Sequence, residues 1–145
     1  FSTDGNWIFF TDTVVGKIFR APLDGEGSPG RPELHIDFSN YAGHPDGMCT
    51  DTEGGLWICH FAGSRISRFR EDGTLEREIL LPVPNVTKCT FGGKALRTLY
   101  ITTAATGLDE SQRRQFPLSG GLFTVETTFQ GVPTVAVPRP SCVAH

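Results

Sequence analysis

Three similar pairs of short apolar segments follow one another along this chain, and they constrain its fold more than any other feature. The first members of the pairs begin at Ile8, Leu56 and Leu99, so the starts lie 48 and then 43 residues apart. Apolar, aromatic and β-branched residues dominate these segments, and turns rich in Asp, Gly and Pro separate them. A repeat of about 40 to 50 residues that contains several short strands is typical of a β-propeller blade.

The middle repeat is the clearest of the three and predicts four strands. We expect these strands at residues 47–51, 56–61, 65–70 and 75–81. Turn residues at 53–55 and at Asp72-Gly73 connect them as hairpins. The chain is therefore expected to be all-β and to form about three four-stranded blades of a β-propeller.

The three blades are expected to cover about residues 1–40, 45–84 and 86–140, with the last strand of the third near 134–137. Three blades cannot close a ring, and exposed sheet edges promote association with other strands. We therefore expect missing N-terminal blades, or a second chain, to complete the fold.

Composition and charge exclude several classes of partner. The net charge is −3, from 13 basic and 16 acidic residues, and the longest basic run is Arg113-Arg114. A nucleic-acid surface or a polybasic membrane anchor needs a stronger basic cluster. No apolar run approaches the roughly 18 residues that cross a bilayer. We expect neither nucleic acid nor a membrane as a partner, and a small neutral or polar molecule fits better.

The four cysteines form no C-x-x-C pair, and three of them lie within apolar runs that resemble strands. They are Cys49, Cys59, Cys89 and Cys142. Buried structural thiols fit this pattern better than zinc ligands do. Free thiols favour a reducing compartment, so we expect a cytoplasmic protein.

An insertion at residues 104–120 interrupts the third repeat between its second and third strands. Its polar stretch 109–115 is long enough for one or two helical turns, and Asp109 is a suitable N-cap. The insertion is either a solvated surface excursion or a flap over a pocket, because long loops on rigid β scaffolds often carry specificity.

Asp46 stands out because it places one carboxylate at the start of an otherwise apolar strand, in the segment His-Pro-Asp-Gly-Met-Cys-Thr-Asp at 44–51. A carboxylate in apolar surroundings is costly unless a positive group meets it. Asp-Gly is also a common turn dipeptide, so a purely structural role for Asp46 remains open.

Several further motifs occur in the same order as in a known family. They are Pro45-Asp46-Gly47-Met48-Cys49, Gly55-Leu56-Trp57, Ser-Arg-Ile-Ser-Arg-Phe at 64–69, the segment 81–93, Leu-Tyr-Ile-Thr at 99–102 and Pro-Leu-Ser-Gly-Gly-Leu-Phe at 117–123. With them, almost the whole chain resembles the SMP-30/gluconolactonase/regucalcin family. The resemblance implies a six-bladed propeller of which this chain is the C-terminal half.

The resemblance also implies one divalent metal ion in the central tunnel of the propeller. Family members bind it with a Glu, two Asn and the Asp of the Pro-Asp-Gly-Met segment, which is Asp46 here. The other three ligands would lie upstream of Phe1. Carboxylate and amide oxygens suit Ca²⁺, which we expect, while Zn²⁺, Mg²⁺ and Mn²⁺ are alternatives.

The function that the resemblance implies is metal-dependent hydrolysis of the carboxylic ester bond of a sugar lactone to give an aldonic acid. Asp46 would be the metal ligand and the catalytic residue, either as ligand alone or as a ligand that also takes a proton from the attacking water. The fragment alone would be inactive. A non-catalytic calcium-binding propeller of regucalcin type is the alternative, and hydrolysis of another ester or phosphoester is a third option.

Other polar residues are expected near the same face as Asp46. Asp12, His60 and Thr103 end the second strands of the three repeats, and His44 precedes the Asp46 segment. His60 is the candidate for substrate binding, through a sugar hydroxyl or a proton relay, although a structural role is the alternative for both histidines. Asp12 fits a cap of the following turn better than a ligand contact.

Overall fold

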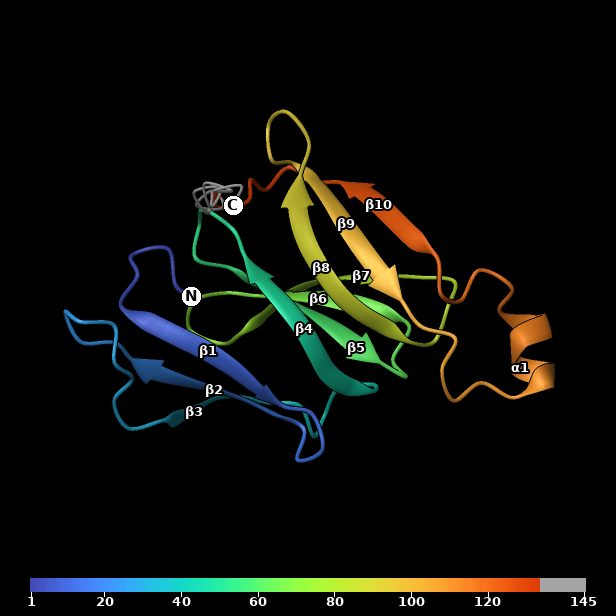
Figure 1. Cartoon of the computed structure of the whole chain (residues 1–145), viewed down its shortest axis with the longest axis horizontal. Coiled ribbons are helices and arrows are strands. Elements are labelled where there is room, and N and C mark those ends of the chain that lie inside the picture. The colour runs from blue at the N-terminus through green and yellow to red at the C-terminus, as the bar shows by residue number, and fades with distance from the viewer. Residues whose placement is uncertain (134–145) are drawn as a thin grey trace, which may run out of the picture.

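Three antiparallel sheets follow one another along the chain in the computed structural model, which describes residues 1–133 (Figure 1). The first sheet contains β1 (Trp7–Asp12), β2 (Lys17–Pro22) and β3 (Glu33–Asp37); the middle sheet contains β4 (His44–Thr50), β5 (Leu56–Phe61), β6 (Arg65–Phe69) and β7 (Leu75–Leu80); the third contains β8 (Val86–Gly92), β9 (Thr98–Thr103) and β10 (Leu122–Glu126). The all-β prediction is confirmed.

The number of strands differs between the sheets. The middle sheet has the four strands expected, in the order β4-β5-β6-β7, whereas the first and third have three strands each within the described residues. The strand expected near 134–137 lies outside those residues. Figure 1 shows β4 between β1 and β8, so the first strand of the middle sheet lies next to both neighbouring sheets.

Two apolar cores lie between the three sheets, one on each side of the middle sheet. Leu56 and Ile58 of β5 join a cluster with residues of the first sheet, such as Ile18. Trp57 and Cys59 point to the opposite face and join a cluster with residues of the third sheet. Alternate residues of a strand point to opposite faces. This sandwiched position explains why β5 is apolar almost throughout.

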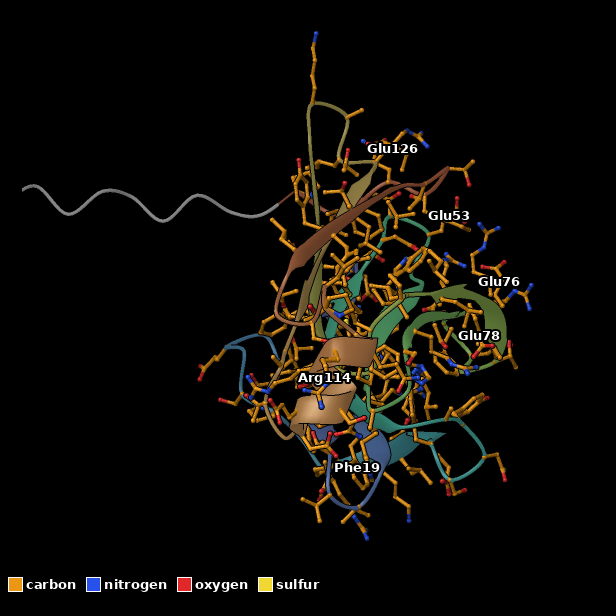
Figure 2. The ribbon with its side chains drawn as sticks, turned by 90° about the vertical axis from the view of Figure 1, so that its right-hand side faces the viewer. Phe19, Glu53, Glu76, Glu78, Arg114 and Glu126 are labelled. Carbon is orange, nitrogen blue, oxygen red and sulfur yellow. The ribbon has the colours of Figure 1, made fainter. Side chains whose placement is uncertain are left out.

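A buried ionic network that the sequence analysis did not identify fixes the β4–β5 turn. The Asp51 carboxylate is fully buried and accepts hydrogen bonds from Trp57 Nε1 at 2.7 Å, Gly55 N at 2.9 Å and Arg68 Nε at 2.7 Å. Arg68 also pairs with Glu76. Figure 2 shows Glu76 near Glu53 and Glu78 along one side of the molecule.

The insertion between β9 and β10 carries the short helix α1 (Glu110–Gln115), as expected. Asp109 Oδ1 accepts a hydrogen bond from Gln112 N at 2.8 Å, and Gln112 Oε1 accepts one from Asp109 N at 2.9 Å. This reciprocal pair is a capping box, so the predicted N-cap is confirmed. No residue of α1 is buried, and no helix among the described residues is long and apolar enough to cross a bilayer.

Candidate functional site

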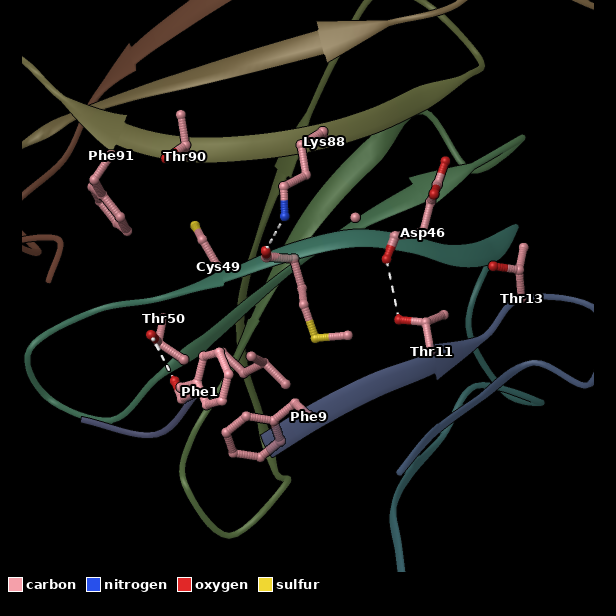
Figure 3. A pocket seen from close by; sticks show the side chains of 13 residues that line it. Phe1, Phe9, Thr11, Thr13, Asp46, Cys49, Thr50, Lys88, Thr90 and Phe91 are labelled. Atoms are coloured by element: carbon pink, nitrogen blue, oxygen red, sulfur yellow. Dashed lines mark hydrogen bonds between the residues drawn. The ribbon is translucent and has the colours of Figure 1, made fainter. Parts of the chain in front are cut away.

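A cavity of about 440 Å³ lies where β1, β4 and β8 meet (Figure 3). Asp46 and Lys88 contribute the charged side chains of its wall, and Phe9, Met48 and Phe91 contribute apolar ones. Most of the lining residues lie on β1, β4 and β8, with Phe1, Thr13 and Leu56 of β5 beside them, and none belongs to the insertion at 104–120. The insertion therefore fits the surface excursion better than a flap over this cavity.

Asp46 is positioned by an irregularity in β4. The pairing of β4 with β5 is regular up to Pro45↔His60 and resumes at Met48↔Ile58. Two residues of β4, Asp46 and Gly47, thus lie opposite the single residue Cys59 of β5. This arrangement is a β-bulge in β4. Bulges redirect side chains and are frequent beside functional sites. The Asp-Gly dipeptide, which is also compatible with a turn, lies inside a strand here.

Gly47 allows β4 and β8 to approach each other directly beside Asp46. A Cβ atom at position 47 would lie 2.6 Å from the carbonyl oxygen of Thr87 and 2.5 Å from Cδ of Lys88. Real Cβ atoms essentially never come that close to another heavy atom, and the Thr87 oxygen is backbone that cannot rotate away. The glycine after Asp46 is therefore required by packing rather than by turn geometry.

Burial and the neighbouring Lys88 set the electrostatic environment of Asp46. Burial raises the pKa of its carboxyl group above the ordinary value, and the Gly47 N–H and the Lys88 cation offset part of that rise. Lys88 Nζ donates a hydrogen bond to the carbonyl oxygen of Met48 at 2.5 Å, as Figure 3 shows. Thr11 Oγ1 donates to the backbone oxygen of Asp46 at 3.3 Å and ties β1 to the bulge.

His60 is fully buried and lies outside the lining of this cavity. Its Nδ1 lies 2.7 Å from the carbonyl oxygen of Ala42, and its ring packs against Phe38 with 4.9 Å between centroids. Burial lowers the pKa of His60, so the ring is neutral near pH 7 and Nδ1–H is the donor. This geometry matches the structural alternative, and substrate binding by His60 stays a prediction.

The remaining candidates also lie away from the cavity lining. His44 is exposed at the start of β4. Asp12 Oδ1 accepts a hydrogen bond from Val15 N at 3.0 Å and so caps the following turn. Thr103 Oγ1 donates to the carbonyl oxygen of Gly121 at 2.8 Å. Of the residues that the sequence suggested for catalysis, substrate binding or metal binding, Asp46 alone lines the cavity.

Lys88 and Thr11 are cavity residues that the sequence analysis did not single out. Lys88 lies on β8, two residues before Thr90, and both line the cavity. Alternation along a strand would have placed Lys88 and Thr90 on one face, but only the packing of β8 against β4 shows which face meets Asp46.

The described residues contribute one carboxylate to this site and contain no cluster of three or more His, Cys, Asp or Glu side chains that could hold a metal ion. An Asp oxygen is a suitable ligand for a hard divalent cation, but Ca²⁺ takes six to eight oxygen ligands. Asp46 therefore fits as one member of a ligand set and does not form a complete site within residues 1–133.

Comparison with known proteins assigns the chain to a family. Residues 1–105 match the model of the SMP-30/Gluconolactonase/LRE-like region. This chain belongs to the SMP-30/gluconolactonase family. Among curated proteins of similar sequence, a 6-deoxy-6-sulfogluconolactonase of Pseudomonas putida is 37% identical over 132 residues, which cover 90% of this chain and 45% of that protein. A regucalcin of Gallus gallus is 42% identical over 126 residues, 86% of this chain and 42% of that protein.

Solved structures of the SMP-30/gluconolactonase family agree with this fold. A calcium-binding regucalcin of Agrobacterium tumefaciens matches with a TM-score of 0.86 at 30% identity, over 91% of this chain and 45% of that one. A luciferin-regenerating enzyme matches with a TM-score of 0.85 at 28% identity, over 94% and 47%. The propeller architecture is thereby confirmed. The chain spans a little less than half the length of these relatives.

Proposed function

We propose that this chain forms part of a metal-dependent sugar lactonase in which Asp46 is a metal ligand. The observation that carries the proposal is the position of Asp46, the one carboxylate in the wall of the cavity, on a bulge of the inner strand β4. The names of the curated relatives support a sugar lactone as substrate and its hydrolysis as the reaction.

Lactone hydrolysis requires attack of water on the ring carbonyl and cleavage of the ring C–O bond, which gives an aldonic acid. A divalent cation, expected to be Ca²⁺, would polarise the carbonyl and lower the pKa of a bound water. The Asp46 carboxylate would bind the cation and could also accept a proton from the attacking water, because it lies in the wall of the cavity. Lys88 adds a positive charge to the same wall.

The remaining ligands would come from protein segments that cover the first sheet. Phe10 and Phe19 stack on each other, with 5.6 Å between ring centroids, on the face of the first sheet that points away from the middle sheet. Leu34 of β3 pairs with Phe19 and is half exposed. Figure 2 places Phe19 at one end of the molecule. An apolar sheet face of this kind supports the proposal that further blades, or a second chain, pack there.

The proposal is tested in the protein expressed from its complete gene, with the Asp46→Asn variant. We expect hydrolysis of glucono-δ-lactone, measured by proton release, to fall by at least about 100-fold, and Ca²⁺ affinity, measured by calorimetry, to fall with it. Asp24→Asn is the matched control, because Asp24 is exposed and only bonds the backbone of its own turn. Retention of both activity and affinity in Asp46→Asn would refute the proposal.

A non-catalytic calcium-binding propeller is the second candidate, and a solved relative described as a calcium-binding protein favours it. The same experiments separate the two candidates. Tight Ca²⁺ binding that depends on Asp46, without turnover of a panel of sugar lactones in the presence of Ca²⁺ or Zn²⁺, would support the non-catalytic role.

A further inference from the structure

Three thiols gather where the middle sheet packs against the third sheet. Cys49 on β4 and Cys89 on β8 place their Sγ atoms 3.6 Å apart, and Cys59 on β5 belongs to the same apolar cluster. All three are free cysteines. Cys89 is 1% exposed and Cys59 is fully buried, whereas Cys49 is partly exposed and lines the cavity. The pair therefore contains one thiol that solutes can reach and one that they cannot.

The strands that carry Cys49 and Cys89 are held close together by the residues next to them. Lys88 Nζ bonds the carbonyl oxygen of Met48 at 2.5 Å, and Gly47 lets the β4 backbone approach Thr87. A disulfide has an S–S distance of about 2.05 Å, so the two sulfurs, now 3.6 Å apart, must approach by roughly 1.5 Å. We expect rotation about the Cα–Cβ bonds of the two cysteines to provide this approach.

We propose that Cys49 and Cys89 form a reversible disulfide bond that joins β4 to β8 beside the cavity. The oxidant is a small disulfide, RSSR, that enters the cavity. The Cys49 thiolate attacks one sulfur of RSSR, which forms a mixed disulfide and releases RS⁻. The Cys89 thiolate then attacks Sγ of Cys49 and displaces the second RS⁻. The protein loses two protons and two electrons, and RSSR is reduced to two thiols. This inference is independent of the lactonase proposal.

The surroundings of Cys49 and Cys89 also determine the rate at which the disulfide forms. The hydrogen bond to Cys89 and burial both raise the pKa of the Cys49 thiol far above its ordinary value. The hydrogen bond with Cys49 lowers the pKa of the Cys89 thiol, but a hydrogen bond with Cys59 and burial outweigh it and raise that pKa as well. Thiolate is the attacking species, so oxidation is slow near neutral pH and accelerates as the pH rises.

The test uses the protein expressed from its complete gene, with Cys142, which lies outside the described residues, replaced by serine. After incubation with oxidised glutathione at about pH 8.5, peptide mapping is expected to find Cys49 linked to Cys89. The thermal midpoint is expected to rise by roughly 5 °C or more, and dithiothreitol is expected to reverse both changes.

Two variants serve as controls. Cys59→Ala is expected to form the same link, because Cys59 is buried out of reach of the oxidant. In Cys49→Ser, Cys89 is expected to remain a free thiol, because the accessible partner is gone. A stable glutathione adduct on Cys49 with Cys89 still free, a link that contains Cys59, or unmodified Cys49 after prolonged incubation would each overturn the proposal.

Discussion

At the scale of single residues, the candidate site depends on a carboxylate and on the glycine that follows it. Asp46 projects from a bulge, and its raised pKa reflects partial burial. Gly47 has no side chain at a point where β8 leaves no space for one. Asp46 therefore provides the carboxylate of the candidate site, and Gly47 provides the space that β8 needs. The sequence Asp-Gly alone does not reveal this packing role of Gly47.

The packing role of Gly47 predicts that Gly47→Ala destabilises the fold. The added methyl group would meet the backbone oxygen of Thr87 at 2.6 Å, so β4 and β8 must move apart. We expect the free energy of unfolding, measured in urea, to fall by about 1–3 kcal/mol. Gly25→Ala is the control, because a Cβ atom there meets nothing within 4 Å. Equal losses in the two variants would contradict the close approach.

At the scale of elements, the middle sheet is held together by more than its strand pairing. The buried Asp51 carboxylate bonds the backbone of the β4–β5 turn, the indole of Trp57 on β5 and the guanidinium of Arg68 on β6. Arg68 also lies over the ring of Phe129, 3.9 Å from its centroid. The Asp51–Arg68 pair thus connects the β4–β5 turn, β5, β6 and the segment after β10.

This network predicts a large effect for Arg68→Met. The substitution leaves the Asp51 carboxylate buried without its cation, which is expected to lower the free energy of unfolding by about 3–5 kcal/mol. Arg70→Met is the matched control. Arg70 pairs with Glu76 but its side chain is 55% exposed, so a loss of less than about 1 kcal/mol is expected there. Denaturant titration of both variants measures the difference, and similar losses would argue against the network.

At the scale of the whole molecule, the described residues form three sheets with two shared cores and an uncovered apolar face on the first sheet. Phe10 is 39% exposed and Leu34 is 50% exposed on that face. Exposed apolar patches on a sheet promote association. The relatives are about twice as long as this chain, which agrees with the proposal that more protein packs on this face.

The uncovered face predicts that the 145-residue chain self-associates when it is produced alone. Sedimentation velocity is expected to show oligomers or aggregates at micromolar concentration. The double variant Phe10→Ser and Leu34→Ser is expected to reduce them, whereas Val14→Ser, in the exposed β1–β2 turn, is expected to have little effect. A monomeric chain with a single cooperative unfolding transition would contradict this prediction.

The sequence by itself determined the features that depend on neighbouring residues or on repetition. Runs of apolar, aromatic and β-branched residues between turn dipeptides predicted the strands, such as β5 at Leu56–Phe61, and Asp109 predicted the cap of α1. These signals are readable because they depend on backbone preferences within a few residues. The order of short motifs identified the family, and one of those motifs contained Asp46.

Only the tertiary structure decided which distant residues meet. Lys88 and Asp46 line one cavity, Cys49 lies 3.6 Å from Cys89, and Asp51 is buried against Arg68. His60 is enclosed beside Phe38 although its position in sequence also fits the Asp46 face. The pattern of residues along a strand specifies which side chains share a face of the sheet. How closely two sheets approach depends on side-chain packing, so only the packed structure shows which faces line a cavity.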